Sequence, residues 1–387
     1  MARKAEPGLL REMNERAIFD LIRSRGPASR ADITRHMGIS PPTVSKAVAN
    51  LLECGFLEEV GTAPVNGAGR PGIIYRLGTG MVQVLGAVID VRRCAVLCSG
   101  LDGKVNPQHV LEFATPPTYQ KLIEALDERA QKLMKANGVT TLGLGISTPG
   151  EIDTFRQRIL LSPNLHMIDG CSPRDDLRHR LGIETVMIHD TLGTCLAEHA
   201  YGAAKGMKDF VVVGIYEGFG VSVVSGGRLV QGHRNMAGEV GHVTVDLNGS
   251  RCGCGNRGCL ETVATDAALA RLASSRLGRQ VEIEEIIRTA RSEPIHLPAE
   301  FEKTLEYLSV GIAAVINIFN PEAVLVCARL LDVEGDAFMR LNEKIAKRAL
   351  RPLMNDCRVV RAQGDTQLGA IAGIIHHLTR GLGPVVD

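Results

Sequence analysis

The N-terminal part of the chain repeats its apolar residues with the spacing of α-helices. Apolar positions recur every three or four residues from Leu9 to Ile22, which predicts one amphipathic helix ending before Pro27. The segment Ser29–Asp32 has the pattern of a capping box and predicts a second, short helix. A turn at Gly38 leads to a third helix capped by Ser40. This order of helix, short helix, glycine turn and helix is the helix-turn-helix pattern.

The third predicted helix has the features of a DNA-recognition helix. Two strands that follow it, Glu58–Val60 and Ile73–Leu77, predict a β-hairpin wing. In the loop between them Arg70 stands between a glycine and a proline, which suits insertion into a narrow minor groove. The alternative is a three-helix protein-binding module with an ordinary loop. The residues predicted to contact DNA are Pro42, Thr43, Ser45, Lys46 and Arg70.

From Val82 onward, apolar runs typical of strands alternate with helical stretches. This mixture over most of the chain predicts two α/β lobes with a cleft between them. The predicted strands are Val84–Val91, Val110–Phe113, Thr141–Ser147, Glu184–His189, Val211–Tyr216, Val221–Val224 and Ala323–Cys327, and the predicted helices include Tyr119–Ala136 and Thr191–Ala204.

Length and composition agree with a globular protein of two or three domains. A chain of 387 residues is too long for one compact core. Only 4% of the residues are aromatic, which argues against a stacking surface for single-stranded nucleic acid. Residues 1–77 contain 11 Lys+Arg and 8 Asp+Glu, so this segment carries +3 while the whole chain carries +1. A basic N-terminal segment is compatible with a DNA-binding domain.

The sequence has the features of a cytoplasmic protein. Its first residues are charged and lack the apolar core of a signal peptide. No apolar run approaches the roughly 18 residues needed to cross a bilayer. Most cysteines outside the single Cys-rich run lie in apolar stretches, so we expect reduced thiols and no disulfide framework.

The run GEVGHVTVDLNGSRCGCGNRGCLE predicts a metal site. One imidazole and three thiolates complete a tetrahedral Zn²⁺ site and leave no position for a catalytic water, so we expect a structural zinc ion. The predicted ligands are His242, Cys252, Cys254 and Cys259. The alternative is four unligated residues that are merely near one another in sequence. Glu239 and Glu261 flank the run and are free for another task.

Further loops place short polar residues where predicted strands end. Thr148–Asp153 follows one strand, Ser162–Leu165 comes shortly after it, and Asp190 stands between a strand and a helix. Together with Glu239 and Glu261, these residues are of the type that recognises a polyhydroxylated ligand. Asp190 can also serve as a general base towards a hydroxyl group or as the N-cap of the following helix.

These motifs resemble, in order along the chain, the ROK family of sugar kinases and sugar-responsive repressors. The matching segments are GISTPGEID, SPNL, HDTLGTCLAEHAYGAAKG, GEVGHVTVD, CGCGNRGCLE, NIFNPEAVLV and LGAIAG. A winged helix ahead of this body resembles the repressor branch, which includes N-acetylglucosamine, glucose and xylose regulators. The resemblance implies an actin-like (ribonuclease H-like), two-lobed sugar-kinase fold with the zinc ligands given above. It also implies sugar contacts at Gly150, Asn164, Asp190, Glu239, His242 and Glu261.

Departures from the family's pattern argue against kinase activity. The family's kinases have a glycine-rich first hairpin, where this chain has Asp90-Val91-Arg92-Arg93. Their second phosphate loop is glycine-dense, but Tyr216–Ser222 retains two glycines, and their third, Gly-Gly, is here Ala328-Arg329. Because glycine lets backbone N–H groups approach phosphates closely, we do not expect ATP-dependent phosphorylation. His189 and Leu192 replace asparagines of the family's sugar site.

The sequence therefore predicts a sequence-specific transcriptional regulator, a repressor of carbohydrate-metabolism genes, controlled by a sugar or sugar phosphate in the interlobe cleft. We expect a homodimer, because helix-turn-helix proteins read paired half-sites in operator DNA. The alternatives are a sugar kinase with an added DNA-binding domain, and a DNA-binding protein controlled by another protein. The predicted domains are 1–79, a winged helix-turn-helix; 80–195 with 366–387, the first α/β lobe; and 196–365, the second α/β lobe with the zinc site.

Overall fold

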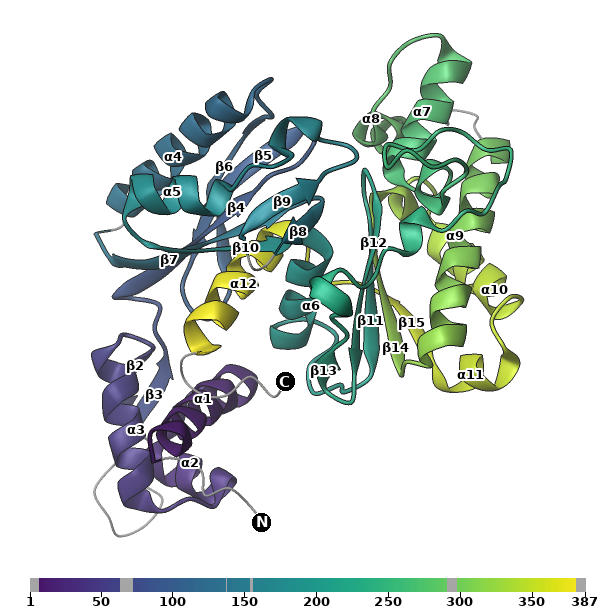
Figure 1. Ribbon diagram of the computed structural model, residues 1–387. Coiled ribbons are helices and arrows are strands. Elements are labelled where there is room, and N and C mark those ends of the chain that lie inside the picture. The colour runs from purple at the N-terminus through teal and green to yellow at the C-terminus, as the bar shows by residue number, and fades with distance from the viewer. Residues whose placement is uncertain (1–6, 63–71, 137, 154–155, 291–297, 381–387) are drawn as a thin grey trace. The chain divides into compact units, whose positions relative to one another are not determined.

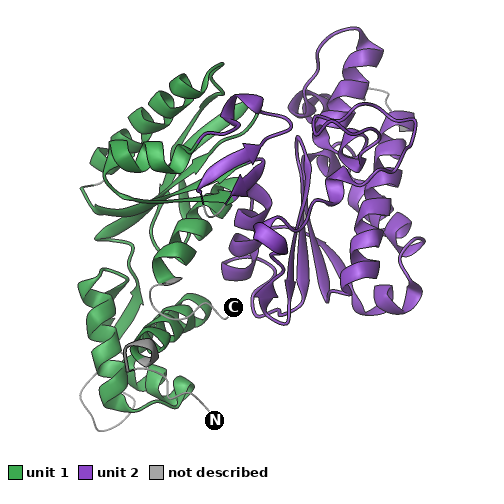
Figure 2. Ribbon diagram, viewed as in Figure 1, with its two compact units in different colours: residues 1–148, 172–188, 366–387 green, residues 149–171, 189–365 purple. Residues whose placement is uncertain are grey.

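The computed structural model describes residues 7–62, 72–136, 138–153, 156–290 and 298–380 (Figure 1). Backbone contacts divide the chain into two compact units, coloured separately in Figure 2. Unit 1 comprises Met1–Thr148, Ser172–Ile188 and Thr366–Asp387, and unit 2 comprises Pro149–Cys171 and His189–Asp365. This grouping joins the N-terminal helices to the first α/β sheet. The division into three domains stays a prediction.

Unit 1 begins with a winged helix-turn-helix. The Ser29 hydroxyl accepts the N–H of Asp32 at 3.2 Å, and the Asp32 carboxylate accepts the N–H of Ser29 at 3.0 Å, so the predicted capping box is confirmed. Ser40 caps the third helix as predicted. The wing is an antiparallel sheet of strand order β1-β3-β2. The elements are α1 (Pro7–Arg25), β1 (Ala28–Ser29), α2 (Arg30–Met37), α3 (Pro41–Glu53), β2 (Leu57–Thr62) and β3 (Ile73–Leu77).

The carboxylate of Glu58, on β2, links β3 to the residues that directly follow β3. It accepts hydrogen bonds from Arg76 Nε at 2.6 Å, Thr79 Oγ1 at 2.9 Å, Thr79 N at 3.2 Å and Gly80 N at 2.9 Å. Burial alone would raise the pKa of Glu58, but these hydrogen bonds outweigh it and lower the pKa to about 2. The ionised carboxylate of Glu58 therefore stabilises the junction between the winged helix and the rest of unit 1.

The remainder of unit 1 is a five-stranded sheet of order β10-β7-β4-β5-β6. Strands β4, β5 and β6 form an antiparallel meander, and β7 runs parallel to β4. Helix α12 packs on β4 and β7 so closely that a Cβ on Gly145 would lie 2.0 Å from the carbonyl oxygen of Ala370. The elements are β4 (Val82–Val88), β5 (Arg93–Ser99), β6 (Val105–Ala114), α4 (Tyr119–Ala136), β7 (Thr140–Thr148), α5 (Pro173–Leu181), β10 (Glu184–His189) and α12 (Thr366–Arg380).

Unit 2 is built on a second five-stranded sheet, of order β13-β12-β11-β14-β15. Strand β11 pairs antiparallel with β12 and parallel with β14, and the apolar side of α9 packs into the same core. A separate hairpin, β8 and β9, carries the first polar loop. The elements are β8 (Glu151–Asp153), β9 (Arg158–Leu161), α6 (Asp190–Ala200), β11 (Phe210–Ile215), β12 (Phe219–Ser225), β13 (Arg228–Leu229), α7 (Asp266–Leu277), α8 (Ile283–Ala290), α9 (Pro298–Phe319), β14 (Ala323–Ala328), α10 (Ala337–Ala346), α11 (Arg351–Asp356) and β15 (Arg358–Arg361).

Most predicted elements are present, with their ends moved by a few residues. The bounds of Tyr119–Ala136 and Glu184–His189 match the prediction. The strand predicted at Val84–Val91 instead ends at Val88, and the predicted helix Thr191–Ala204 is Asp190–Ala200. Strand β5 was not predicted, because it is buried along nearly its whole length and lacks the apolar–polar alternation that marks a half-exposed strand. None of the described helices is long and apolar enough to span a membrane.

Candidate metal centre and ligand-binding site

The chain between β13 and α7 folds back on itself through short contacts instead of regular strands. Thr244 and Cys259 form an isolated antiparallel bridge. Gly258 has a φ of +65°, and a Cβ there would lie 1.6 Å from the carbonyl oxygen of Asp246, so only glycine permits this turn. The tight fold of the loop brings residues from both ends of the Cys-rich run together.

The four predicted metal ligands form one cluster. Their donor atoms all lie within 4.8 Å of one another. The Sγ of Cys252 lies 3.6 Å from Nδ1 of His242, and the Sγ atoms of Cys254 and Cys259 are 3.8 Å apart. Two sulfur atoms bound tetrahedrally to zinc at about 2.3 Å are separated by about 3.8 Å. The donor set and its spacing fit a tetrahedral ion, so this cluster can hold a metal.

Carboxylates surround the imidazole of His242. Nδ1, which faces the thiols, lies 3.7 Å from the buried Glu261, and Nε2 lies 3.5 Å from Glu239. Glu261 also accepts a hydrogen bond from the Cys252 thiol at 2.9 Å. The same ring therefore touches the metal cluster through one nitrogen and a carboxylate through the other, an arrangement in which a metal would fix the ring's orientation.

Glu239 lies among three further carboxylates. Its partial burial, a hydrogen bond with Glu151, and the negative charges of Glu151, Glu261 and Asp190 together raise the pKa of Glu239 above its usual range. Glu151, at the start of β8, was not among the predicted ligand contacts. The sequence placed Glu151 in the polar loop Thr148–Asp153 without singling it out.

Gly150 and Asn164 belong to the same unit as these carboxylates. The φ of Gly150 is +93°, and a Cβ there would lie 2.6 Å from the carbonyl oxygen of Leu161, so the loop needs glycine. A Cβ on Gly218 would lie 3.3 Å from Glu261 Oε2 and 3.6 Å from Asn164 Nδ2. The amide of Asn164 therefore lies near the carboxylate of Glu261, across a glycine that leaves the space between them open.

Asp190 begins α6. Its Oδ1 accepts the Thr191 N–H at 2.5 Å and the Thr191 hydroxyl at 3.1 Å, and it lies 3.2 Å from Nδ1 of His189. The carboxylate therefore occupies the N-terminal turn of the helix, where negative charge is stabilised. Its charge also contributes to the raised pKa of Glu239, so Asp190 lies in the neighbourhood of that carboxylate.

Bulky side chains make contacts at the ends of β11 and β14. In unit 2, Tyr216 Oη lies 2.5 Å from Cys327 Sγ. Arg329, directly after β14, forms ion pairs with the buried Asp266 and with Glu284. Burial raises the pKa of Asp266 to about 7 despite this arginine. Side-chain contacts therefore hold the segments that follow β11 and β14.

The first two turns of α3 carry four of the predicted DNA contacts. Pro42, Ser45 and Lys46 are exposed, while Thr43 is half-buried and its hydroxyl lies 2.8 Å from that of Ser40. The opposite side of α3, with Val44, Val48 and Leu51, is buried. Arg70 lies outside the described residues.

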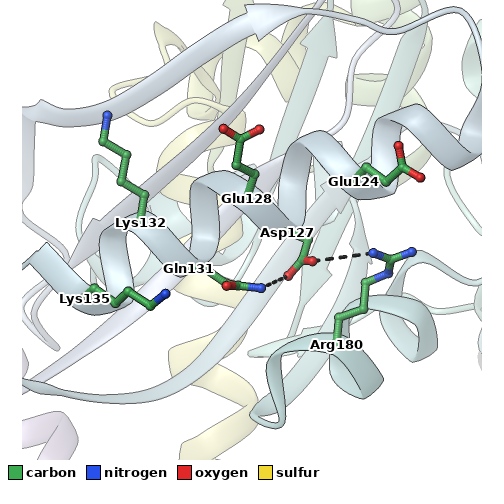
Figure 3. Close-up of a pocket in the computed structure, with 7 residues that line it drawn as sticks. All are labelled: Glu124, Asp127, Glu128, Gln131, Lys132, Lys135 and Arg180. Atoms are coloured by element: carbon green, nitrogen blue, oxygen red, sulfur yellow. Dashed lines mark hydrogen bonds and ion pairs between the residues drawn. The ribbon is translucent and has the colours of Figure 1, made fainter.

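A shallow pocket on unit 1 shows no comparable chemistry. It lies on α4 and α5, where Asp127 pairs with Arg180 at 3.5 Å and accepts a hydrogen bond from Gln131 at 3.0 Å (Figure 3). The other lining side chains carry both signs of charge. This is the mixed polarity of a solvated helix face.

Comparisons with known proteins identify the class to which the fold and the site belong. The model of the ROK family matches residues 89–376, so the chain belongs to the ROK family. Residues 11–63 match the model of the iron dependent repressor, N-terminal DNA binding domain. The actin-like sugar-kinase fold preceded by a DNA-binding winged helix is therefore confirmed, as is the predicted family.

Individual relatives cover almost the whole chain. The DNA-binding transcriptional dual regulator NagC of Escherichia coli K12 is 25% identical over 395 residues, covering 97% of this chain and 95% of its own. The xylose repressor of Bacillus spizizenii is 24% identical, covering 96% and 97%. A solved ROK family transcriptional regulator, a homologue of the E. coli MLC protein, superposes with a TM-score of 0.80 at 23% identity and covers 96% and 98%. The regulators therefore share both the N-terminal domain and the body of this chain.

Proposed function

We propose that this protein is a sugar-responsive repressor of carbohydrate-metabolism genes. It binds operator DNA through the winged helix, with Pro42, Thr43, Ser45, Lys46 and Arg70 as contacts. A sugar binds at the carboxylate site of unit 2 and changes operator affinity. The family and the match to a DNA-binding domain support this function. Relatives that match over nearly their whole length, and are named as transcriptional regulators, support it as well.

The observation that carries the proposal is the contrast within unit 2. The positions that the family uses for sugar, Asp190, Glu239, His242 and Glu261, lie within reach of one another, with Gly150 and Asn164 on neighbouring loops. The segments that would meet ATP are instead fixed by side chains, including Arg329 paired with Asp266. In this proposal the protein binds a sugar without phosphorylating it, and Asp190 is a ligand contact.

His242, Cys252, Cys254 and Cys259 would hold a structural zinc ion. When bound, the ion supplies rigidity to the loop and no open coordination position for chemistry. In this proposal His242 contacts the sugar with the nitrogen that faces Glu239. Because helix-turn-helix proteins read paired half-sites, the working form is a homodimer. Sugar binding then changes operator affinity by the difference in ligand affinity between two states, typically about 1–3 kcal/mol.

The proposal is tested by a gel shift on the DNA upstream of the chain's own gene. The probes are a panel of hexoses, pentoses, amino sugars and their phosphates, with ATP added in one arm. We expect one sugar to change operator affinity, Glu239→Ala to abolish that change, and no ADP to form. Sugar-dependent ADP production would favour the kinase alternative. Operator binding that no sugar alters would favour control by another protein.

A further inference from the structure

The two arginines of α2 have different partners. Arg35 forms an ion pair with Asp32 of the same helix. Arg30, the first residue of α2, forms neither an ion pair nor a hydrogen bond with any described residue; instead, its Cζ lies 5.2 Å from the centroid of the Tyr75 ring. A cation over the face of a tyrosine is attracted by the ring but keeps its N–H donors free. No carboxylate of the described winged helix therefore neutralises the charge of Arg30.

The side chain of Arg30 is anchored at its base and open at its tip. Its Nε is buried without a hydrogen-bond partner, although the residue as a whole is only half-buried. The two terminal nitrogens also lack a partner among the described residues, yet they are not buried atoms, so they reach the surface. Tyr75, below the guanidinium, is fully buried on β3. A planar guanidinium held in this way is pre-organised to donate two hydrogen bonds to an anion.

Arg30 also lies at the base of the wing. The preceding residue, Ser29, pairs with Ile74 of β3, and a Cβ on Gly72 would lie 3.5 Å from the Cβ of Ser29. In a helix-turn-helix, the second helix enters the major groove while the first crosses the sugar–phosphate backbone. Arg30 therefore belongs to the helix that meets phosphates, next to the hairpin that is predicted to reach the minor groove.

We infer that Arg30 binds a phosphate of the DNA backbone and that Tyr75 positions it for this contact. The inference rests on the proposed function, and it adds a contact outside α3 and the wing loop. Because every nucleotide carries the same phosphate, the contact contributes affinity without sequence preference. Tyr75 acts through its ring, since its own hydroxyl is buried and has no partner among the described residues.

The test is fluorescence anisotropy of the full-length protein with two duplexes of equal length over a range of salt concentrations. One duplex is the DNA upstream of the chain's own gene, and the other has a random sequence. We expect Arg30→Gln to weaken binding to both duplexes by the same factor, about tenfold, and to reduce each salt slope by about one. Arg30→Lys keeps the charge without the planar guanidinium, so it should recover the slope and only part of the affinity.

The outcomes separate this inference from the proposed function. Equal affinity and slope in Arg30→Gln and the natural protein would overturn the inference and leave the function intact. A loss confined to the upstream duplex would also overturn it, because such a loss indicates a base contact. Failure of the natural protein to bind either duplex would overturn both.

The matched control is Arg35→Gln. It removes the same charge from the same helix, but that charge is already paired with Asp32, so both affinities should stay within about twofold of those of the natural protein. If Arg35→Gln lost as much affinity as Arg30→Gln, α2 would act through its net charge alone, and the specific role of Arg30 would be contradicted.

A double-mutant cycle tests the positioning role of Tyr75. Tyr75→Leu removes the ring and should weaken binding to both duplexes, whereas Tyr75→Phe keeps the ring and should restore the affinity. In the Tyr75→Leu background, Arg30→Gln should cost much less than in the natural protein, because the guanidinium has already lost its orientation. An equal cost in both backgrounds would show that Tyr75 does not position Arg30. Thermal unfolding identifies any variant that fails to fold, and the surface variants of Arg30 test the phosphate contact even if Tyr75→Leu does.

Discussion

Two carboxylates of this protein have opposite surroundings. Glu58, in the wing, accepts four hydrogen bonds, one of them from an arginine, and its pKa is lowered to about 2. Glu239, beside the metal cluster, is hydrogen-bonded to another carboxylate, and its pKa is raised. The difference indicates that the first is committed to holding the fold together, whereas the second has binding capacity that the protein itself leaves unused.

The same contrast separates two arginine-paired carboxylate sites from the ligand site. Arg76 completes the Glu58 joint, and Arg329 is held by Asp266 and Glu284. These two arginines pair with structural carboxylates, whereas the described ion pairs of Asp190, Glu239 and Glu261 involve histidines. If this interpretation is right, substitutions at the two kinds of carboxylate must affect different measurements.

The largest expected effect comes from breaking the metal cluster. Cys252→Ser removes a buried ligand, and we expect loss of bound zinc, loss of sugar binding, and a fall in the free energy of unfolding of roughly 4 kcal/mol or more, because metal binding contributes directly to folding. Elemental analysis and calorimetry measure these changes. The control is Cys54→Ser, an exposed cysteine outside the cluster. Full zinc content in Cys252→Ser would show that the cluster is not the metal site.

How far the sequence predicts this site depends on the range of the interactions. The helix-turn-helix and the Cys-rich run are local patterns, so the caps Ser29 and Ser40 and the cluster of His242 with three cysteines were all predicted. Glu151 was predicted only as part of the polar loop Thr148–Asp153, because its contact with Glu239 joins segments that lie far apart in the sequence. The Glu58 joint was missed for a similar reason, since three of its four hydrogen bonds come from Thr79 and Gly80.

The next largest effect is the pH dependence that Glu58 contributes. Because its pKa is lower in the folded protein than in the unfolded chain, Glu58 stabilises the fold above about pH 4.5, and this contribution is lost as the pH falls towards 2. A shift of about 2.5 units corresponds to an upper limit of about 3 kcal/mol. Unfolding measured from pH 5 to pH 2 in the natural protein and in Glu58→Gln isolates this contribution. Parallel stability curves for the two proteins would contradict it.

The direct test of the comparison exchanges each carboxylate for an amide. Glu58→Gln should lower the free energy of unfolding by about 2 kcal/mol, because several hydrogen bonds to a charged group are weakened, and should leave sugar affinity unchanged. Glu239→Gln should abolish sugar binding and change stability by less than about 0.5 kcal/mol. Denaturant unfolding and titration with the sugar provide the two readings. If Glu239→Gln destabilised the protein as much as Glu58→Gln, both carboxylates would be structural and the contrast would be wrong.

The smallest expected effect is a change in operator affinity at the DNA-binding surface. We expect this surface to act independently of sugar binding when DNA is absent. Lys46 is exposed in the second turn of α3. The variant Lys46→Ala should weaken operator binding about tenfold and reduce the salt slope by about one, as expected for a lost phosphate contact. Sugar affinity without DNA should not change. Lys132→Ala, which removes an exposed lysine from α4, is the matched control and should alter neither measurement. A salt slope that is equal in Lys46→Ala and the natural protein would remove Lys46 from the interface and direct attention to the hydroxyl of Ser45, which makes its contact without releasing a counterion.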